Sequence, residues 1–223
     1  MGKVELKKYI SNALSGSLPR SMLTPIRQYS RDGHNELLFR DLVLNSDSTV
    51  IDFGGYVGDF SEEIRRRFDS EIHIFEPMPI FSKALNVRFE FNNKIHVHSH
   101  AVGLARREIF LAPDGEATSE FRGSDGLRCE MRALEETVLV EFSWVDVIAI
   151  NIEGGEYELI QALDHSAILS KVGHLLIQFH KVGSDHVERR SECVAILAKT
   201  HVLEWSYEYV WESWRLRTEL DPR

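Results

Sequence analysis

Short apolar runs alternate with amphipathic stretches along most of the chain. The apolar runs are rich in valine, isoleucine and phenylalanine, and they predict strands at residues 49–53, 71–75, 94–99, 145–150 and 175–179. Apolar residues at three- and four-residue spacing predict helices at 58–68, 79–89, 157–163 and 187–199. Strands that alternate with helices in this way are typical of a parallel sheet with crossover helices. The sequence therefore predicts an α/β fold with a mainly parallel sheet and helices on both faces.

The alternation is interrupted in two places. Residues 105–142 contain strand-like pieces at 108–111 and 138–142 around a polar, glycine-containing middle, which predicts a hairpin or loop. Near the end, residues 202–207 and 209–216 predict a closing antiparallel pair. We therefore expect the last strand to run against the others.

The first part of the chain has a different character. Residues 1–47 are predicted to be a helical or irregular lead-in, in which Pro19 and Pro25 break any long helix. Within it, residues 35–44 carry apolar side chains at helical spacing. With 223 residues, 43% of them hydrophobic, the chain suits one domain of ordinary size, which we place at residues 48–223.

Charge and cysteine content narrow the function classes. The net charge of −9 argues against a broad basic face for nucleic acid. Two cysteines, Cys129 and Cys193, fit free thiols in a reducing compartment better than a disulfide framework. They form no C-x-x-C motif, so no thiolate metal site is indicated. No apolar run approaches the ~20 residues of a membrane span, and the basic, amphipathic segment 1–9 precedes no secretory apolar core. We expect a cytoplasmic protein with no nucleic-acid partner.

The most informative segment joins the first strand to the first helix of the alternation. Asp52 is followed by Gly54, Gly55 and Gly58, in the spacing D-x-G-x-x-x-G. Glycines let a backbone turn tightly and approach a ligand closely. Glu76 ends the next strand about 20 residues later, where a carboxylate can accept hydrogen bonds from a ribose diol. The pattern predicts a site for a nucleoside-containing cofactor.

Asp52 helps to choose the cofactor. A carboxylate inside the loop repels the pyrophosphate of NAD and attracts the ammonium and sulfonium groups of S-adenosylmethionine, since charges about 4 Å apart interact by several kcal/mol. We therefore favour S-adenosylmethionine as the cofactor. An NAD-dependent oxidoreductase acting on a nucleotide sugar is the enzyme alternative. A non-catalytic protein that binds a cofactor and recruits a partner is the alternative outside enzymes.

Three further segments carry a family resemblance. They are residues 144–160 (WVDVIAINIEGGEYELI), the F-E-P at 75–77 and the Q-F-H at 178–180. Together with the glycine loop they resemble the FkbM family of methyltransferases over residues 48–215. The tail at 205–214 resembles a subgroup associated with glycan gene clusters. The resemblance implies a class I methyltransferase domain at 48–223 with S-adenosylmethionine as its cofactor. It further implies O-methylation of a hydroxyl on a small molecule, with a sugar or a glycan precursor as the expected acceptor.

The sequence departs from the family pattern at two positions. Ala149 stands where the family usually has lysine, and Asn151 stands where it usually has aspartate. A T-L-D motif before residue 145 is also missing. These departures keep the non-catalytic alternative open.

The candidate site residues have distinct expected roles. His180 ends a strand on the ligand side of the sheet, and a histidine with a pKa near 6.5 suits a general base for the acceptor hydroxyl. Glu153 and Asn151 follow the 145–150 strand and are expected beside the reacting groups. Ala101 and Val102 are expected near the adenine, and Pro77 is expected among the cofactor-binding residues. For Glu156, a favourable interaction with the helix dipole is a sufficient explanation.

No metal is assigned from the sequence. His96, His98 and His100 alternate along one strand and so share one face, but we interpret them as partly exposed strand residues. A cation held by Glu153, Asn151 and His180 is conceivable, yet nothing in their spacing requires it.

Overall fold

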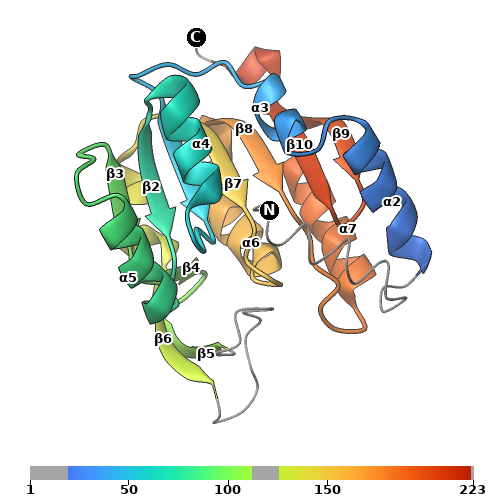
Figure 1. The fold of residues 1–223 in the computed structure, drawn as a ribbon. Helices are drawn as coiled ribbons and strands as arrows, with labels where there is room; N and C mark the ends of the chain where they lie inside the picture. The colour runs from blue at the N-terminus through green and yellow to red at the C-terminus, as the bar shows by residue number, and fades with distance from the viewer. Residues whose placement is uncertain (1–19, 112–125, 222–223) are drawn as a thin grey trace.

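A computed structural model describes residues 20–111 and 126–221. Its centre is a seven-stranded sheet with the order β3-β2-β1-β7-β8-β10-β9 (Figure 1). The strands of this sheet are β1 Thr49–Phe53, β2 Glu71–Phe75, β3 Ile95–His98, β7 Val145–Ile150, β8 Val172–Ile177, β9 His201–Tyr207 and β10 Trp211–Leu216. The first five pair in parallel, whereas β10 runs antiparallel to both β8 and β9. The predicted α/β class and the reversed last strand are both confirmed.

Helices cover both faces of this sheet. They are α2 Arg20–Arg31, α3 Leu37–Arg40, α4 Asp59–Phe68, α5 Pro79–Arg88, α6 Glu156–His165 and α7 His186–Leu197. One apolar core includes Ile51 and Ile148 of the sheet with Leu159 of α6 and Leu197 of α7. The other core joins the opposite face to α2, α4 and α5. Among the described residues, no helix combines the length and the apolar character needed to cross a membrane.

The lead-in is more regular than its prolines predicted. Helix α2 continues through Pro25, so the expected break at this residue is wrong. Pro25 removes one backbone hydrogen bond, and the burial of Ile26 and Tyr29 against the sheet offsets that loss. Residues 35–44 form the end of a 3-10 turn, His34–Glu36, and the short α3, and Val43 is exposed. The segment 1–9 and Pro19 lie outside the described residues.

The segment after β3 forms a small second sheet. Strands β4 Ala101–Gly103, β5 Arg107–Leu111 and β6 Leu127–Ala133 lie in the order β4-β6-β5, with β5 and β6 antiparallel as the predicted hairpin requires. The strand expected at 138–142 is wrong, because Val138–Glu141 is a 3-10 turn that buries Leu139. Among the described residues between β3 and β7 no α-helix forms, and the small sheet takes the place of a crossover helix.

Candidate active site

A cavity of about 370 Å³ is lined by residues at the carboxyl ends of β1, β2 and β7 and by residues of the small second sheet. Figure 1 shows the second sheet, β4 to β6, at the end of the main sheet towards which β2 points. Backbone hydrogen bonds extend the sheet to the wall of the cavity. Gly54 N donates to Phe75 O, and Asn151 N donates to Phe53 O, each at 2.9 Å. Seven residues predicted from the sequence line the cavity: Gly54, Glu76, Pro77, Ala101, Val102, Asn151 and Glu153. Carboxyl ends of parallel strands are where ligands bind in open α/β sheets.

Gly54 has a position that only glycine can occupy. Its φ is +90°, and a Cβ atom there would lie 2.0 Å from the backbone oxygen of Asn151. The loop therefore passes directly against the end of β7, which leaves its backbone open to the cavity. Gly55 and Gly58 do not line the cavity. They allow the loop to pack against Ile74 of β2 and Leu85 of α5.

Glu76 is buried and lies at the cavity wall. Its two carboxylate oxygens accept hydrogen bonds from the backbone N–H groups of Tyr56 and Met78, both at 2.9 Å. Burial raises the pKa of Glu76 to about 7, although these two hydrogen bonds act in the opposite direction. Each oxygen keeps a lone pair for a further donor. Glu76 thus holds the glycine loop and can still accept hydrogen bonds from a ligand.

Asp52 has a different position from the one expected. It is 4% exposed, does not line the cavity, and accepts a 2.6 Å hydrogen bond from the Ser61 hydroxyl of α4. Burial raises its pKa to about 6. The direct attraction of a cofactor cation that we expected from Asp52 is therefore corrected: the residue joins β1 to α4. Carboxylates that do line the cavity are Glu76, Glu153 and Glu158.

One wall of the cavity is apolar. Ala101 and Val102, which were expected near the adenine, lie among side chains that mostly come from the second sheet. The others are Phe81 of α5 and Ile109, Leu111 and Met131 of β5 and β6. The last three reach the cavity only through the pairing of the second sheet, so the linear pattern offered no signal for them. A flat aromatic group fits such a wall.

His180 lies between two carboxylates at the end of β8. Its Nε2 is 3.4 Å from Glu153 Oε1, and its Nδ1 is 3.4 Å from Glu156 Oε1. Glu156 is fully buried and also accepts hydrogen bonds from the backbone N–H groups of Gly154 and His180, at 2.7 Å each. Glu156 therefore has a structural role that goes beyond the helix dipole.

This arrangement changes the role expected of His180. Burial opposes a charged imidazole, but the two carboxylates outweigh burial and raise the pKa of His180 to about 10. A protonated imidazole cannot accept a proton, and His180 does not line the cavity. This geometry argues against the general-base role that a pKa near 6.5 suggested for His180. The cavity-lining member of the cluster is Glu153, held at a left-handed φ of +51°.

We expect His180 to remain protonated across the neutral range. Its raised pKa means that its contribution to stability is complete below pH 6.5 and is lost as the pH rises towards 10. Carbon-13 NMR of the labelled imidazole should show no titration between pH 6 and 8, with the His180→Asn variant used to assign the signal. A signal that titrates near pH 6.5 contradicts this expectation and restores His180 as a base.

Two polar residues complete the cavity wall. Asn151 Oδ1 is buried and has no hydrogen-bond partner in the described structure, so the Asn151 amide can meet a ligand. Arg189 of α7 also lines the cavity, with its guanidinium 4.2 Å from the centre of the Tyr157 ring. Nothing in the sequence singled out Arg189, because its helix reaches the cavity only through tertiary packing.

Comparison with known proteins identifies the fold. No protein-family model matches the sequence, and no curated protein matches it. Among solved structures, the chain is similar to a protein described as an rRNA methylase from Clostridium thermocellum, with 9% identity, TM-score 0.50 and coverage of 81% of this chain and 92% of that one. It is also similar to the N-methyltransferase NodS from Bradyrhizobium japonicum WM9 bound to S-adenosylhomocysteine, with 14% identity, TM-score 0.44 and coverage of 84% and 87%. The first likeness shows the class I methyltransferase fold; the FkbM assignment stays a prediction.

Proposed function

We propose that this protein is an S-adenosylmethionine-dependent methyltransferase that methylates a hydroxyl group of a small molecule, of the sugar or glycan-precursor class. The observation that carries the proposal is the cavity itself. Gly54, Glu76 and Asn151 come from the ends of three adjacent strands and line one cavity opposite an apolar wall.

The lining residues fit the parts of this cofactor. Glu76 can accept hydrogen bonds from the ribose diol, and the wall around Ala101 and Met131 suits the adenine. The unpartnered Oδ1 of Asn151 and the open backbone at Gly54 suit the amino-acid portion. When bound, the cofactor supplies an electrophilic methyl group on a sulfonium. Acidic lining residues favour that positive charge.

The nicotinamide alternative is less compatible with the glycine loop. Dinucleotide enzymes place a pyrophosphate at the N-terminus of the helix that follows the loop. Here the first turn of that helix, α4, contains Asp59 and Glu62. Arg88, the cation next to this turn, is paired with Asp59 at 2.9 Å. Two carboxylates at the helix start oppose an anionic ligand.

Glu153 is the residue that we propose to accept the proton of the acceptor hydroxyl. It lines the cavity beside Asn151, and the protonated His180 behind it holds the carboxylate in place. Methyl transfer needs the acceptor oxygen close to the methyl group and a base for its proton. The resemblance to the FkbM family supports a hydroxyl, and a net charge of −9 supports a neutral acceptor over nucleic acid.

The departure at Ala149 has a local explanation. Ala149 is buried in the core that faces α4 and α5, so it does not contact the cavity. Its difference from the family pattern therefore leaves the reacting groups untouched, which weakens the case for a non-catalytic protein. Cofactor binding with no turnover across a broad panel of hydroxyl acceptors would favour that alternative.

Cofactor binding is the direct test. S-adenosylhomocysteine should bind with a micromolar Kd, or roughly 7–8 kcal/mol, measured by calorimetry. Glu76→Gln should weaken binding about 10- to 100-fold, because one charged hydrogen-bond acceptor for the ribose is lost. Asp59→Asn, at the start of α4 but outside the cavity lining, is the matched control and should bind normally. Binding of NADH but not of S-adenosylhomocysteine would overturn the proposal.

A further inference from the structure

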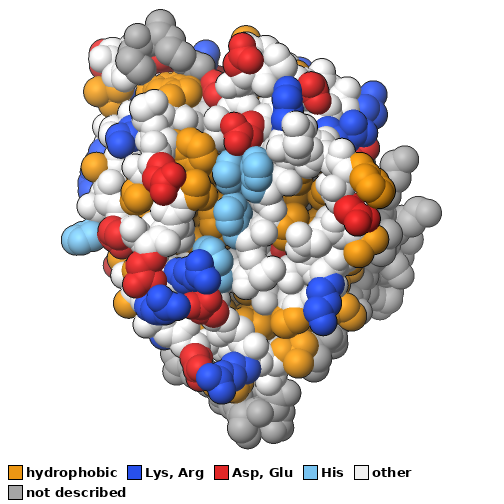
Figure 2. Space-filling model, turned by 90° about the vertical axis from the view of Figure 1, so that its left-hand side faces the viewer, with side chains coloured by type: hydrophobic (Ala, Val, Ile, Leu, Met, Phe, Trp, Pro, Cys, Tyr) orange, Lys and Arg blue, Asp and Glu red, His pale blue; other side chains and the backbone are white. Residues whose placement is uncertain are grey.

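Four histidines form a stack on the outer part of the sheet. Its inner end packs against Phe75, which lines the cavity and lies 4.5 Å from His98 and 5.4 Å from His100 between ring centroids. His96, His98 and His73 pack ring against ring, with centroids of His73 and His96 at 4.7 Å and of His73 and His98 at 5.3 Å. His100 continues the row at 6.0 Å from His98. Figure 2 shows the histidine side chains running in a row across this face. The expected shared face and partial exposure hold for His96 and His98, but His100 is 5% exposed and is buried.

The row reaches the surface at His96, whose side chain is 42% exposed. In the described residues between β3 and β7, the small second sheet and two 3-10 turns are present and no α-helix forms. Phe142 packs edge-on against His73, at 5.1 Å. Small solutes can therefore reach His96, whereas His73 is buried beside it.

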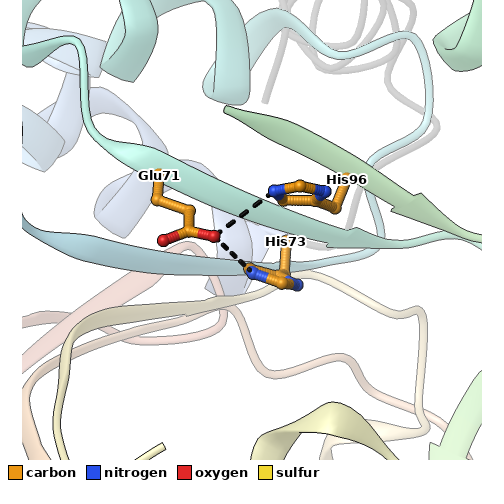
Figure 3. A group of neighbouring side chains, drawn as sticks. All are labelled: Glu71, His73 and His96. Carbon is orange, nitrogen blue, oxygen red and sulfur yellow. Dashed lines mark ion pairs between the residues drawn. The ribbon is translucent and has the colours of Figure 1, made fainter. Parts of the chain in front are cut away.

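Glu71, His73 and His96 converge at one point of the stack. Figure 3 shows the Glu71 carboxylate directed at both rings, with Oε1 3.5 Å from His73 Nε2 and 3.3 Å from His96 Nε2. Their three ligand atoms all lie within 4.8 Å of one another. Ligands about 2.0–2.1 Å from a tetrahedral ion are roughly 3.3 Å apart, so the two measured distances match the edges of such a site.

The burial of His73 also favours a ligand at its Nε2. This nitrogen is buried, and its contact is the Glu71 carboxylate at 3.5 Å, which is too long for a strong hydrogen bond. An ion between the two groups would satisfy both. The other nitrogen, Nδ1, lies 3.0 Å from His98 Nε2. A second hydrogen bond of this kind fixes the ring orientation of histidines that bind metals.

From these contacts we propose that Glu71, His73 and His96 bind one divalent transition-metal ion of the zinc type, with a fourth position open to water. Imidazole nitrogens and a carboxylate are the ligands that suit this class of ion. His98 acts behind the ligand set as the partner of His73.

The site would serve the fold and not the proposed methyl transfer. The ligands Glu71 and His73 precede Phe75, the cavity residue that ends β2, by roughly 13 and 7 Å along the strand, and none of the three ligands lines the cavity. The ion would join the edge strand β3, which carries His96, to its only neighbour β2 in the seven-stranded sheet. Binding of the ion should therefore stabilise the folded protein.

Zinc titration of the full chain, freed of metal by chelation, tests the proposal. Calorimetry should show one zinc ion per chain, and zinc should raise the midpoint of thermal unfolding. His96→Gln and Glu71→Gln should each weaken zinc binding by at least about tenfold. Their side chains are 42% and 46% exposed, so both variants should fold. Binding of S-adenosylhomocysteine reports separately on the fold and on the proposed function.

The matched control is His165→Gln, an exposed histidine at the end of α6, which should bind zinc as the unmodified protein does. Cobalt in place of zinc should give the visible absorption of a four-coordinate site, and His96→Gln should remove it. The proposal is overturned if the unmodified protein takes up no zinc at one equivalent. It is equally overturned if neither His96→Gln nor Glu71→Gln weakens binding.

Discussion

Replacing Glu153 with glutamine is expected to lower kcat by about 10²- to 10⁴-fold, the usual contribution of a general base. The substitution keeps the shape of the side chain but removes the proton acceptor that lines the cavity. Cofactor affinity should change much less, because the glycine loop and Glu76 are untouched. The measurement is release of S-adenosylhomocysteine with the best acceptor from a panel of sugars and other hydroxyl compounds.

Glu158 offers a matched control for this prediction. It also lines the cavity, but its carboxylate is already bound by Arg107 at 2.6 and 2.7 Å and by the backbone N–H of Leu104 at 2.9 Å. Glu158→Gln should therefore reduce kcat far less than Glu153→Gln. Equal losses of kcat in the two variants would mean that catalysis depends on the negative charge of the cavity as a whole and not on one specific base. A near-normal kcat in Glu153→Gln would show that the proton leaves directly to water.

Gly54→Ala is expected to cause the largest loss of stability and of cofactor binding together. The new Cβ would lie 2.0 Å from the backbone oxygen of Asn151, and the residue would keep a φ of +90°. Backbone strain costs about 1–3 kcal/mol and overpacking about 1–3 kcal/mol, so we expect roughly 2–6 kcal/mol in total. That is a large part of the stability of an ordinary domain.

The control for Gly54→Ala is Gly33→Ala. Gly33 has a φ of +117°, but a Cβ atom there would meet nothing within 4 Å. Gly33→Ala therefore carries the backbone strain without the collision, and it should leave the affinity for S-adenosylhomocysteine unchanged. Urea unfolding gives the free energies, and calorimetry gives the affinities. If the two variants lose equal stability, the close approach of the loop to β7 is not essential.

The parallel half of the fold was predictable because its information is local. Strands 49–53, 71–75 and 145–150 were predicted with the bounds that the structure shows, since each is a short apolar run ended by glycine or a polar residue. The positions of the proposed cofactor-binding residues follow from the same local pattern. Gly54 and Glu76 sit at the carboxyl ends of neighbouring strands, so a parallel sheet necessarily brings them to one edge.

Tertiary structure alone decided the charged neighbours of His180 and the hydrogen-bond partner of Asp52. In the sequence, His180 is separated by more than 20 residues from Glu156, and its pKa depends on both that residue and Glu153. Asp52 belongs to the glycine-loop motif, yet the packing of α4 on β1 makes the Ser61 hydroxyl its hydrogen-bond donor. A pKa depends on how far the neighbouring charges lie and how deeply the group is buried. The spacing of residues along the sequence gives neither quantity.

The apolar cavity wall and the histidine cluster also depended on the tertiary structure. The wall comes from a hairpin whose strands face the cavity only after the small sheet folds over it. Glu71 and His96 lie on different strands, and the pairing of β2 with β3 brings them to 3.3 Å. The sequence by itself determined the α/β class, the glycine loop and the strand-end position of Glu76, because these depend on neighbours along the chain. Contacts between distant segments decided the rest, because only the folded chain sets their distances and their exposure to water.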